Sequence, residues 1–307
     1  MRVLVLGAGG QVGRELMRRP WPGGWQVEGR ARAEADLADP AALRAAILGC
    51  APDLVVNAGA YTAVDRAESE REAAFAVNAV APGIVGAAAR ECGAAVIHYS
   101  TDYVFDGNGN GNGSGGRGED DPVAPLGVYG ASKEAGERAL RAAHDRHVIL
   151  RTSWVFGALG ANFVRTMWRL GTERAEVRVV ADQHGCPTPA AAIAEATVTI
   201  ARRVADGSGR WGTFHFAGTP PTSWAGLAEA VFAEMARRTG RRPALVPIAT
   251  ADYPTPARRP ANSVLDCGRI RVAYGIAAPD WRAGLAVVLD ETTAAAPPAP
   301  AGGEGRA

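Results

Sequence analysis

The sequence predicts an α/β fold in which a doubly wound parallel sheet is followed by a smaller C-terminal lobe. Two observations lead to this prediction. Strand-like and helix-like segments alternate through the first half of the chain, and the alternation loosens from about residue 155, where proline becomes frequent. Repeated β-α-β units build a parallel sheet that helices cover on both faces. The 307 residues suffice for one large domain or two modest ones.

The first strand and the turn after it have the pattern of a dinucleotide site. An apolar run at residues 2–6 is followed by Gly7, Gly10 and Gly13, with the spacing G-x-x-G-x-x-G, and then by a helical pattern. The first glycine permits a tight turn, the second lets the backbone approach a pyrophosphate, and the third allows close packing of helix on strand. A helix N-terminus also favours an anion. This pattern predicts a Rossmann-type core in which the glycine turn, with Gln11 and Val12, holds the cofactor.

Further elements follow in order along the chain. Strand-like runs lie at residues 53–57, 94–99 and 147–151, and alanine-rich helical segments lie near 40–49, 67–92 and 128–143. We assign residues 1–155 to the NAD(P)-binding core, with parts of 156–250 returning to it. Residues 156–291 are expected to form mainly a substrate-binding lobe over the carboxyl edge of the sheet, where ligands of open α/β sheets bind. A flexible loop is expected from Gly107 to Gly118, and a disordered tail over 292–307.

Tyr129 and Lys133 are four residues apart in a predicted helix, downstream of Thr101. Positions i and i+4 share one helix face, so the Lys133 ammonium is expected near the Tyr129 hydroxyl. A nearby positive charge would lower the tyrosine pKa from its usual value of about 10 toward neutrality. The pair then predicts a keto-group reductase in which Tyr129 delivers a proton to a developing alkoxide. Taken alone, the pattern also fits a surface Tyr and Lys on an amphipathic helix.

The composition excludes several other classes of protein. A net charge of +1 gives no electrostatic sign of binding to nucleic acid or to an anionic membrane. No apolar run is expected to reach the roughly 20 residues that span a bilayer, and the N-terminus lacks the pattern of a signal peptide. We therefore expect a cytoplasmic protein with no membrane partner. No metal site is predicted, and the widely spaced cysteines are expected to be reduced structural thiols: Cys50, Cys92, Cys186 and Cys267.

Five blocks of sequence, in order, resemble the dTDP-4-dehydrorhamnose reductase family of extended short-chain dehydrogenases. The resemblance covers nearly everything from Met1 to about Leu289. The blocks are Asn-Ala-Gly-Ala-Tyr-Thr-Ala-Val-Asp at 57–65, His-Tyr-Ser-Thr-Asp-Tyr-Val-Phe at 98–105, Arg-Thr-Ser-Trp-Val-Phe at 151–156, Asp-Gln-His-Gly-Cys-Pro-Thr at 182–188, and Tyr-Pro-Thr-Pro at 253–256 leading to Arg259-Pro260 and Asn262-Ser263.

The resemblance implies an activity and roles for individual residues. It implies that a dTDP-linked 6-deoxyhexulose is reduced at its carbon-4 keto group, most simply dTDP-4-dehydro-β-L-rhamnose to dTDP-L-rhamnose. Tyr129 would be the proton donor, Lys133 would hold the nicotinamide ribose and tune Tyr129, and Thr101 would hydrogen-bond the keto oxygen. Asp102 would contact a sugar hydroxyl. Val64 and Trp154 would be walls of the sugar pocket, although both are also explained by ordinary core packing.

The choice of cofactor depends on the end of the second predicted strand. Arg30 and Arg32 favour NADPH, because an arginine suits the 2′-phosphate, whereas Glu28 could serve the ribose hydroxyl of NADH if the strand ends early. NADH therefore remains an alternative, as does a purely surface role for the arginines. The resemblance further implies that the following residues contact the cofactor: Asp36, Leu37, Ala58, Ala60, Tyr61, Thr62 and Tyr99.

Two rival functions stay open from the sequence. One is a sister dTDP-keto-sugar reductase that makes another deoxysugar, such as dTDP-dihydrostreptose. The other is a non-catalytic NADP-binding regulatory subunit, as in methionine adenosyltransferase, although such a subunit has no physical reason to keep Thr101, Tyr129 and Lys133 together. The chain is expected to be a monomer or a homodimer. Some relatives dimerise around a divalent ion, but beside Glu15 the second carboxylate is replaced by alanines at 190–192.

Overall fold

The computed structural model describes residues 1–108 and 116–294. Its centre is a six-stranded parallel sheet of order β10-β5-β4-β3-β1-β2. This confirms the predicted parallel α/β fold. The order reverses between β1 and β3, and ligands of such sheets bind beyond the carboxyl ends of the strands at that point. The strands are β1 (Arg2–Leu6), β2 (Gln26–Arg30), β3 (Leu54–Asn57), β4 (Ala95–Thr101), β5 (His147–Thr152) and β10 (Gly212–His215).

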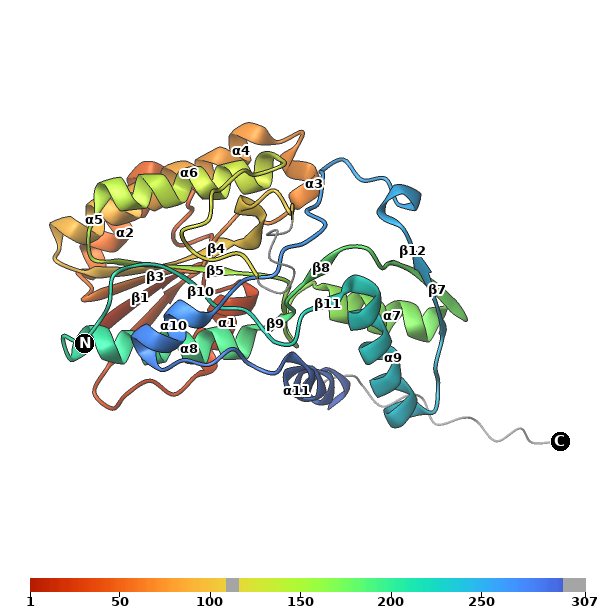
Figure 1. The fold of residues 1–307 in the computed structure, drawn as a ribbon. Helices are drawn as coiled ribbons and strands as arrows, with labels where there is room; N and C mark the ends of the chain where they lie inside the picture. The colour runs from red at the N-terminus through yellow and green to blue at the C-terminus, as the bar shows by residue number, and fades with distance from the viewer. Residues whose placement is uncertain (109–115, 295–307) are drawn as a thin grey trace.

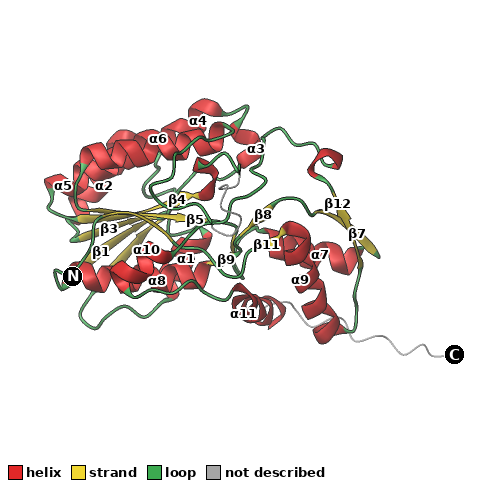
Figure 2. Cartoon of the chain, in the orientation of Figure 1, coloured by secondary structure: helices red, strands yellow, loops and turns green. Residues whose placement is uncertain are grey.

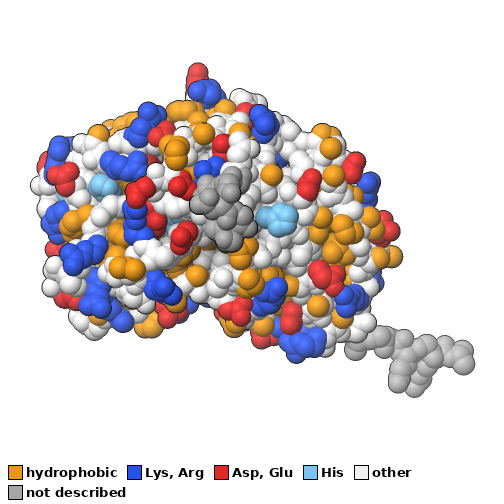
Figure 3. Space-filling view, in the orientation of Figure 1, with side chains coloured by type: hydrophobic (Ala, Val, Ile, Leu, Met, Phe, Trp, Pro, Cys, Tyr) orange, Lys and Arg blue, Asp and Glu red, His pale blue; other side chains and the backbone are white. Residues whose placement is uncertain are grey.

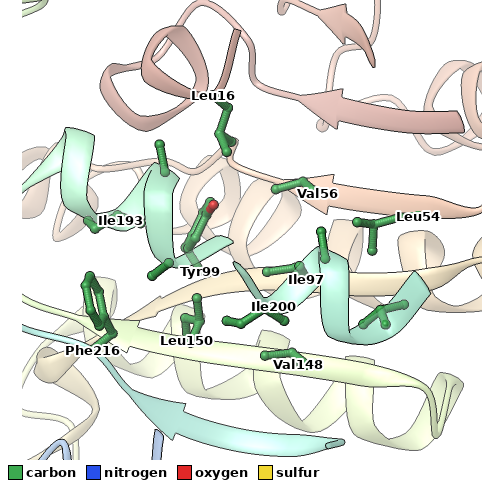
Figure 4. Close-up of a cluster of buried hydrophobic side chains, with 14 of the residues drawn as sticks. Leu16, Leu54, Val56, Ile97, Tyr99, Val148, Leu150, Ile193, Ile200 and Phe216 are labelled. Carbon is green, nitrogen blue, oxygen red and sulfur yellow. The ribbon is translucent and has the colours of Figure 1, made fainter. Parts of the chain in front are cut away.

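Helices cover both faces of this sheet (Figures 1 and 2). Alternate residues of a strand point to opposite faces, so each strand contributes to two cores. On one face Leu4 and Leu6 pack with α2 (Pro40–Cys50), α5 (Ala81–Glu91) and α6 (Val128–Ala143). On the other face the strands pack with α1, α8 and α10, as Figure 4 shows for Leu16, Ile193 and Ile200. These three helices are α1 (Gln11–Arg18), α8 (Ala190–Ala205) and α10 (Gly268–Tyr274).

The helix predicted over 67–92 is interrupted. α3 (Val64–Ala67) is followed by α4 (Arg71–Phe75), a π-helical turn η1 (Ala76–Val80) and α5. The expectation about apolar runs was also wrong, because the continuous helical stretch Arg71–Glu91 has 21 residues and contains an 18-residue window with a mean hydropathy of 1.4. By length and composition alone it could cross a membrane. Half of its most apolar window is nevertheless buried in the protein, where alanine permits close packing on α2 and α6.

A second group of elements lies to one side of the sheet (Figure 1). Its core contains Phe156, Phe232 and Trp281, all of which are fully buried. The helices are α7 (Phe163–Glu173), α9 (Trp224–Thr239) and α11 (Trp281–Ala294), and β7 (Glu176–Val180) pairs in parallel with β12 (Ala244–Ile248). Short pairs join β6 (Val155–Phe156) to β9 (Thr188–Pro189) and β8 (His184–Gly185) to β11 (Thr222–Ser223), and two 3-10 turns are η2 (Asp102–Val104) and η3 (Thr250–Asp252).

Two predicted segments lie partly outside the described residues. Of the predicted loop from Gly107 to Gly118, residues 109–115 are not described. The predicted tail begins inside α11, which continues to Ala294, and the remainder at 295–307 is not described. On the face seen in Figure 3, acidic and basic side chains are interspersed. Many such charges form neighbouring pairs, for example Arg169 with Glu173 at 2.7 Å.

Candidate active site

Thr101, Tyr129 and Lys133 come together where β4 ends and α6 begins. Thr101 is the last residue of β4, and Tyr129 and Lys133 lie one turn apart at the start of α6. The first amide of this helix, that of Val128, donates to Glu68 Oε1 at 2.8 Å. A Cβ on Gly130 would lie 2.1 Å from the carbonyl oxygen of Tyr103. Glycine at this position therefore lets α6 approach the end of β4 closely enough for Tyr129 to reach Thr101.

The Tyr129 hydroxyl is held in its protonated form. Burial raises the pKa of Tyr129 to about 12, although a hydrogen bond with Thr101 partly offsets the rise. The prediction that Lys133 lowers the Tyr129 pKa was wrong for the protein without a bound ligand. The ammonium of Lys133 instead donates to the carbonyl oxygen of Tyr99 at 2.7 Å. Desolvation therefore sets the direction of the Tyr129 pKa shift, and Tyr129 keeps the proton that a general acid needs.

Lys133 is almost completely buried. Burial lowers its pKa to about 8, and the charge of Glu137, one turn further along α6, partly offsets this. The imidazole Nε2 of His98 lies 3.5 Å from the Lys133 Nζ. Burial and the charge of Lys133 hold the pKa of His98 well below its ordinary value, so the ring is neutral and can accept a hydrogen bond. These contacts fix the ammonium at the carboxyl edge of the sheet.

A buried ion pair anchors α6 to β5 behind Lys133. The Arg151 guanidinium donates to both carboxylate oxygens of Glu137, at 2.8 and 2.7 Å, and Arg141 donates to Oε2 at 2.7 Å. Burial by itself would raise the pKa of Glu137, but the hydrogen bonds from Arg151 outweigh it and hold the pKa below its usual value. The sequence analysis did not identify this pair. The spacing Lys133, Glu137, Arg141 on one helix face was the available signal.

Asp102 is buried directly after Thr101. Its Oδ1 accepts from the Thr101 hydroxyl at 2.9 Å, and Ser263 also hydrogen-bonds the carboxyl. Burial raises the pKa of Asp102 to about 6 despite these hydrogen bonds. The described contacts of Asp102 are thus within the protein, and its contact with a sugar hydroxyl stays a prediction.

The glycine turn has the geometry that a pyrophosphate site requires. Gly7 has φ +74°, and an added Cβ would lie 2.4 Å from the amide nitrogen of Gly59. A Cβ on Gly13 would lie 2.2 Å from the Gly7 carbonyl oxygen. Helix α1 begins after Gly10, whose φ is −76°, with no side-chain cap and no acidic residue in its first turn. The positive φ therefore belongs to Gly7 and not to Gly10, and the first amides of α1 can bind a phosphate.

The loop after β3 is tied to α6 through Asn78. Asn78 Oδ1 accepts from the Tyr61 amide at 2.8 Å, and its Nδ2 donates to the Tyr61 carbonyl at 3.0 Å and to Ser132 Oγ at 3.1 Å. Ser132 lies between Tyr129 and Lys133 in the chain, and Asn78 lies in the π-helical turn η1. Ala58, Ala60 and Thr62 share this loop. The sequence analysis missed Asn78, although π-turns are common at functional sites.

The residues predicted at the adenosine end lie where β2 ends. Arg30, the last residue of β2, is paired with Glu28 and lies 3.9 Å from Glu34, so the strand does not end at Glu28. Arg32 is exposed and lies 3.4 Å from Asp36. Both arginines are thus already neutralised by carboxylates. Leu37 is buried, and its Cδ1 would meet a Cβ on Gly59 at 2.4 Å.

The carbonyl of Tyr99, rather than its hydroxyl, contacts Lys133. The hydroxyl bonds to Thr197 Oγ1 of α8 at 2.6 Å, inside the core that Figure 4 shows. The carbonyl accepts the hydrogen bond from Lys133. A cofactor contact by Tyr99 stays a prediction.

A small pocket lies beside Tyr129. Val64 from α3 lines it together with Tyr103, Tyr129 and, from the opposite segment, Arg258. Trp154 is not among the lining residues. Its ring stacks on Trp224 at 3.5 Å between centroids, with 5° between planes, and its φ is +46°. A positive φ is rare for a bulky side chain, and such strained residues gather at functional sites.

The described residues include no group of three or more His, Cys, Asp or Glu side chains that could hold a metal ion. Glu15, considered for such a role in the sequence analysis, is buried and binds Arg18 at 2.9 Å.

Known proteins resemble this chain over most of its length. The family model described as "RmlD substrate binding domain" matches residues 1–294. A dTDP-4-dehydrorhamnose reductase of Burkholderia thailandensis is 46% identical over 92% of this chain and 96% of its own length. One from Escherichia coli is 41% identical over 95% and 98%.

Solved structures give the same result. The dTDP-4-dehydrorhamnose reductase of Bacillus anthracis, solved in complex with NADP, is 34% identical, covers 95% of this chain and 99% of its own, and has a TM-score of 0.86. A UDP-glucose 4-epimerase of Thermus thermophilus, at 21% identity and a TM-score of 0.78, shares the fold. From its sequence, its fold and the residues at the ends of its strands, the chain belongs to the dTDP-4-dehydrorhamnose reductase family.

Proposed function

We propose that the protein reduces dTDP-4-dehydro-β-L-rhamnose to dTDP-L-rhamnose with NADPH. The observation that carries this proposal is the protonated Tyr129, hydrogen-bonded to Thr101 beside a small pocket, with Lys133 one turn away. The relatives named above are dTDP-4-dehydrorhamnose reductases, which favours rhamnose over a different deoxysugar. The same names favour a reductase over a regulatory subunit.

In the proposed reaction, NADPH when bound supplies a hydride to carbon 4 of the sugar. Tyr129 donates its proton to the keto oxygen as that oxygen gains negative charge, so that C=O becomes CH–OH. Thr101 hydrogen-bonds the same oxygen and keeps it in line with the phenol. Tyr129 is left as a phenolate and must regain a proton before the next turnover. Lys133, fixed by the Tyr99 carbonyl, is oriented to hold the nicotinamide ribose hydroxyls.

The remaining cofactor contacts extend from the glycine turn to the loop after β3. Gly7, Gly10, Gln11, Val12 and Gly13 would hold the pyrophosphate on the first amides of α1, a cradle that an added Cβ on Gly7 or Gly13 would fill.

Arg30 and Arg32 would exchange their carboxylate partners for the 2′-phosphate, which favours NADPH while NADH remains an alternative. The relative from Bacillus anthracis was solved with NADP. The further cofactor residues proposed are Asp36, Leu37, Ala58, Ala60, Tyr61, Thr62 and Tyr99.

On the substrate side, Val64 would contact the sugar from α3, Trp154 would form a second wall and Asp102 would bind a sugar hydroxyl. Residues 156–291 would then act mainly as the substrate-binding lobe against an NAD(P)-binding core. The four free thiols suit a reducing compartment, which supports a cytoplasmic location. Either a monomer or a homodimer is compatible with this reaction.

The direct test supplies the substrate enzymatically. Purified protein and NADPH are incubated with dTDP-glucose that a 4,6-dehydratase and a 3,5-epimerase have converted, and the product is identified by mass spectrometry and NMR. We expect NADPH oxidation and dTDP-L-rhamnose, and neither with Tyr129→Phe. Formation of another sugar would establish a sister reductase. NADPH binding without turnover of this substrate would contradict the proposal.

A further inference from the structure

Arg258 is a free cation at the pocket beside Tyr129. Its side chain is exposed and lines this pocket together with Val64 and Tyr129. Among residues 1–108 and 116–294, it takes part in no side-chain hydrogen bond or ion pair. Many other arginines of the protein are paired with a carboxylate, including its neighbour Arg259. An unpaired guanidinium at the mouth of a pocket is therefore available to an anionic ligand.

The backbone on both sides of Arg258 is fixed. Arg259 Nη2 and Nη1 donate to the Asp65 carboxylate at 2.8 and 3.1 Å, and Nη1 also donates to the Ala257 carbonyl at 3.2 Å. The Ala257 amide donates to Asp65 Oδ1 at 3.2 Å. Asp65 belongs to α3, one residue after Val64. These contacts hold the Arg258 backbone against the pocket wall, so little backbone freedom is lost when its side chain binds a ligand.

Arg259 already forms an ion pair with Asp65. Hydrogen bonds from Arg259 are the main reason that the pKa of Asp65 lies below its usual value, so this pair stays ionised at neutral pH. The other carboxylate that lines the pocket belongs to Glu68, and its Oε1 accepts from the Val128 amide. Glu68 keeps its negative charge, whereas Arg258 is the guanidinium at this site that no described carboxylate pairs with.

The proposed substrate carries a diphosphate that must lie near this position. Its carbon 4 has to face Tyr129, and the diphosphate is attached at carbon 1, on the opposite side of the sugar ring. With carbon 4 at Tyr129, the diphosphate would lie toward the mouth of the pocket, where the Arg258 side chain is exposed.

We propose that Arg258 binds the diphosphate of the nucleotide-sugar substrate. This inference rests on the proposed function. It assigns Arg258 to substrate binding, separate from Arg30 and Arg32 at the cofactor. A guanidinium can donate two parallel hydrogen bonds to phosphate oxygens, whereas a lysine provides a single point charge.

The test compares thymidine, dTMP and dTDP as ligands of the wild type and three variants, by calorimetry at low and moderate salt. The variants are Arg258→Ala, Arg258→Lys and the matched control Arg271→Ala. Arg271 is exposed on α10 and is likewise without a side-chain partner among the described residues. Thymidine carries no phosphate, so it reports on the nucleoside site alone. The NADPH affinity of each variant reports on folding and on the cofactor site.

We expect Arg258→Ala to weaken dTDP binding about ten- to a hundredfold, as for other charge-assisted hydrogen bonds. Thymidine and NADPH affinities should stay as in the wild type. Arg258→Lys should recover part of the loss, and Arg271→Ala should change nothing. With the keto sugar, KM should rise in Arg258→Ala while kcat at saturation changes little.

The wild type and the variant report on different claims. If wild-type protein bound dTDP no better than thymidine and did not reduce the keto sugar, the proposed function itself would fail, and this inference with it. If the wild type preferred dTDP and Arg258→Ala kept that preference in full, the reductase would stand and the assignment of Arg258 would be overturned. A parallel loss of NADPH binding in Arg258→Ala would also overturn it, because the effect would then be structural.

Discussion

The ammonium of Lys133 donates a 2.7 Å hydrogen bond to the carbonyl oxygen of Tyr99, and so ties the start of α6 to the end of β4. This contact orients Lys133 before any ligand is present. It also keeps a positive charge in a buried place, where burial lowers the Lys133 pKa from 10.5 to about 8. Preorganised charge of this kind favours catalysis but costs stability.

The first prediction concerns that cost. The pKa of Lys133 is lower in the folded chain than in the unfolded chain, so folding releases protons between about pH 8 and 10.5. The penalty is therefore full below pH 8 and disappears as the pH rises through 10.5. The penalty for burying the charged Lys133 is on the order of 3 kcal/mol. Removing the ammonium would leave the Tyr99 carbonyl unpaired, which costs about 1–3 kcal/mol. Lys133→Met should be at least as stable as the wild type at pH 7 in urea unfolding, yet inactive. A clear loss of stability at pH 7 would contradict it.

The second prediction is that Tyr129→Phe keeps NADPH affinity and loses turnover. The ring and its packing remain, while the proton donor and its hydrogen bond with Thr101 are removed. General acid catalysis contributes about 10²- to 10⁴-fold, so kcat should fall by that factor. Steady-state kinetics and a fluorescence titration with NADPH measure the two quantities. A variant with more than about a tenth of the wild-type kcat would show that another group supplies the proton.

The third prediction concerns the cofactor's 2′-phosphate. Arg30→Ala combined with Arg32→Ala should weaken NADPH binding and leave NADH binding nearly unchanged, because only NADPH carries that phosphate. In the wild type, the affinity that the two arginines add for the 2′-phosphate is reduced, because their contacts with carboxylates must first be broken. These carboxylates belong to Glu28, Glu34 and Asp36. Dissociation constants for both cofactors decide the question. Equal losses for the two would mean that the arginines are structural.

The fourth prediction separates phosphate binding from folding. Gly10→Val adds a side chain at an extended φ of −76°, where a Cβ meets its nearest neighbour, the Gly7 carbonyl oxygen, at 3.3 Å. The apoprotein should fold with at most a modest loss of stability, while stabilisation by NADPH should largely vanish. Gly7→Ala is the matched contrast, because its φ of +74° and a contact of 2.4 Å with the Gly59 amide should destabilise the fold itself. Thermal melts with and without NADPH compare the two, and an undiminished shift in Gly10→Val would refute the assigned cradle.

Local spacing explains what the sequence could predict. The glycine turn and the Tyr129–Lys133 pair each lie within a few residues, so their geometry follows from one turn or one helix. The ion pair of Glu137 with Arg151 joins two different elements, α6 and β5. The stacking of Trp154 on Trp224 joins segments far apart in the chain. Their partners are set by tertiary packing, and no short motif encodes them. The sign of the Tyr129 pKa shift was missed for the same reason, since burial belongs to the whole fold.

The π-helical turn shows a second limit. An α-helical pattern over 67–92 gave no sign that the backbone would widen at 76–80, although Asn78 lies there and holds Tyr61. A π-turn contains one residue more than an α-helix needs for the same advance. Deleting one residue would rotate Asn78 by about 100° around the helix, away from the loop it supports.

Lys133 is the only lysine in the sequence, where 33 positions are Lys or Arg. Its compact ammonium donates to the Tyr99 carbonyl and lies beside His98. Chemically, this leaves one side-chain amine in the whole chain. An amine-directed label that reaches this site would modify a single side chain, and isotopic labelling of lysine would give one resonance from the candidate active site without further assignment. The protein therefore carries its own single-site spectroscopic probe.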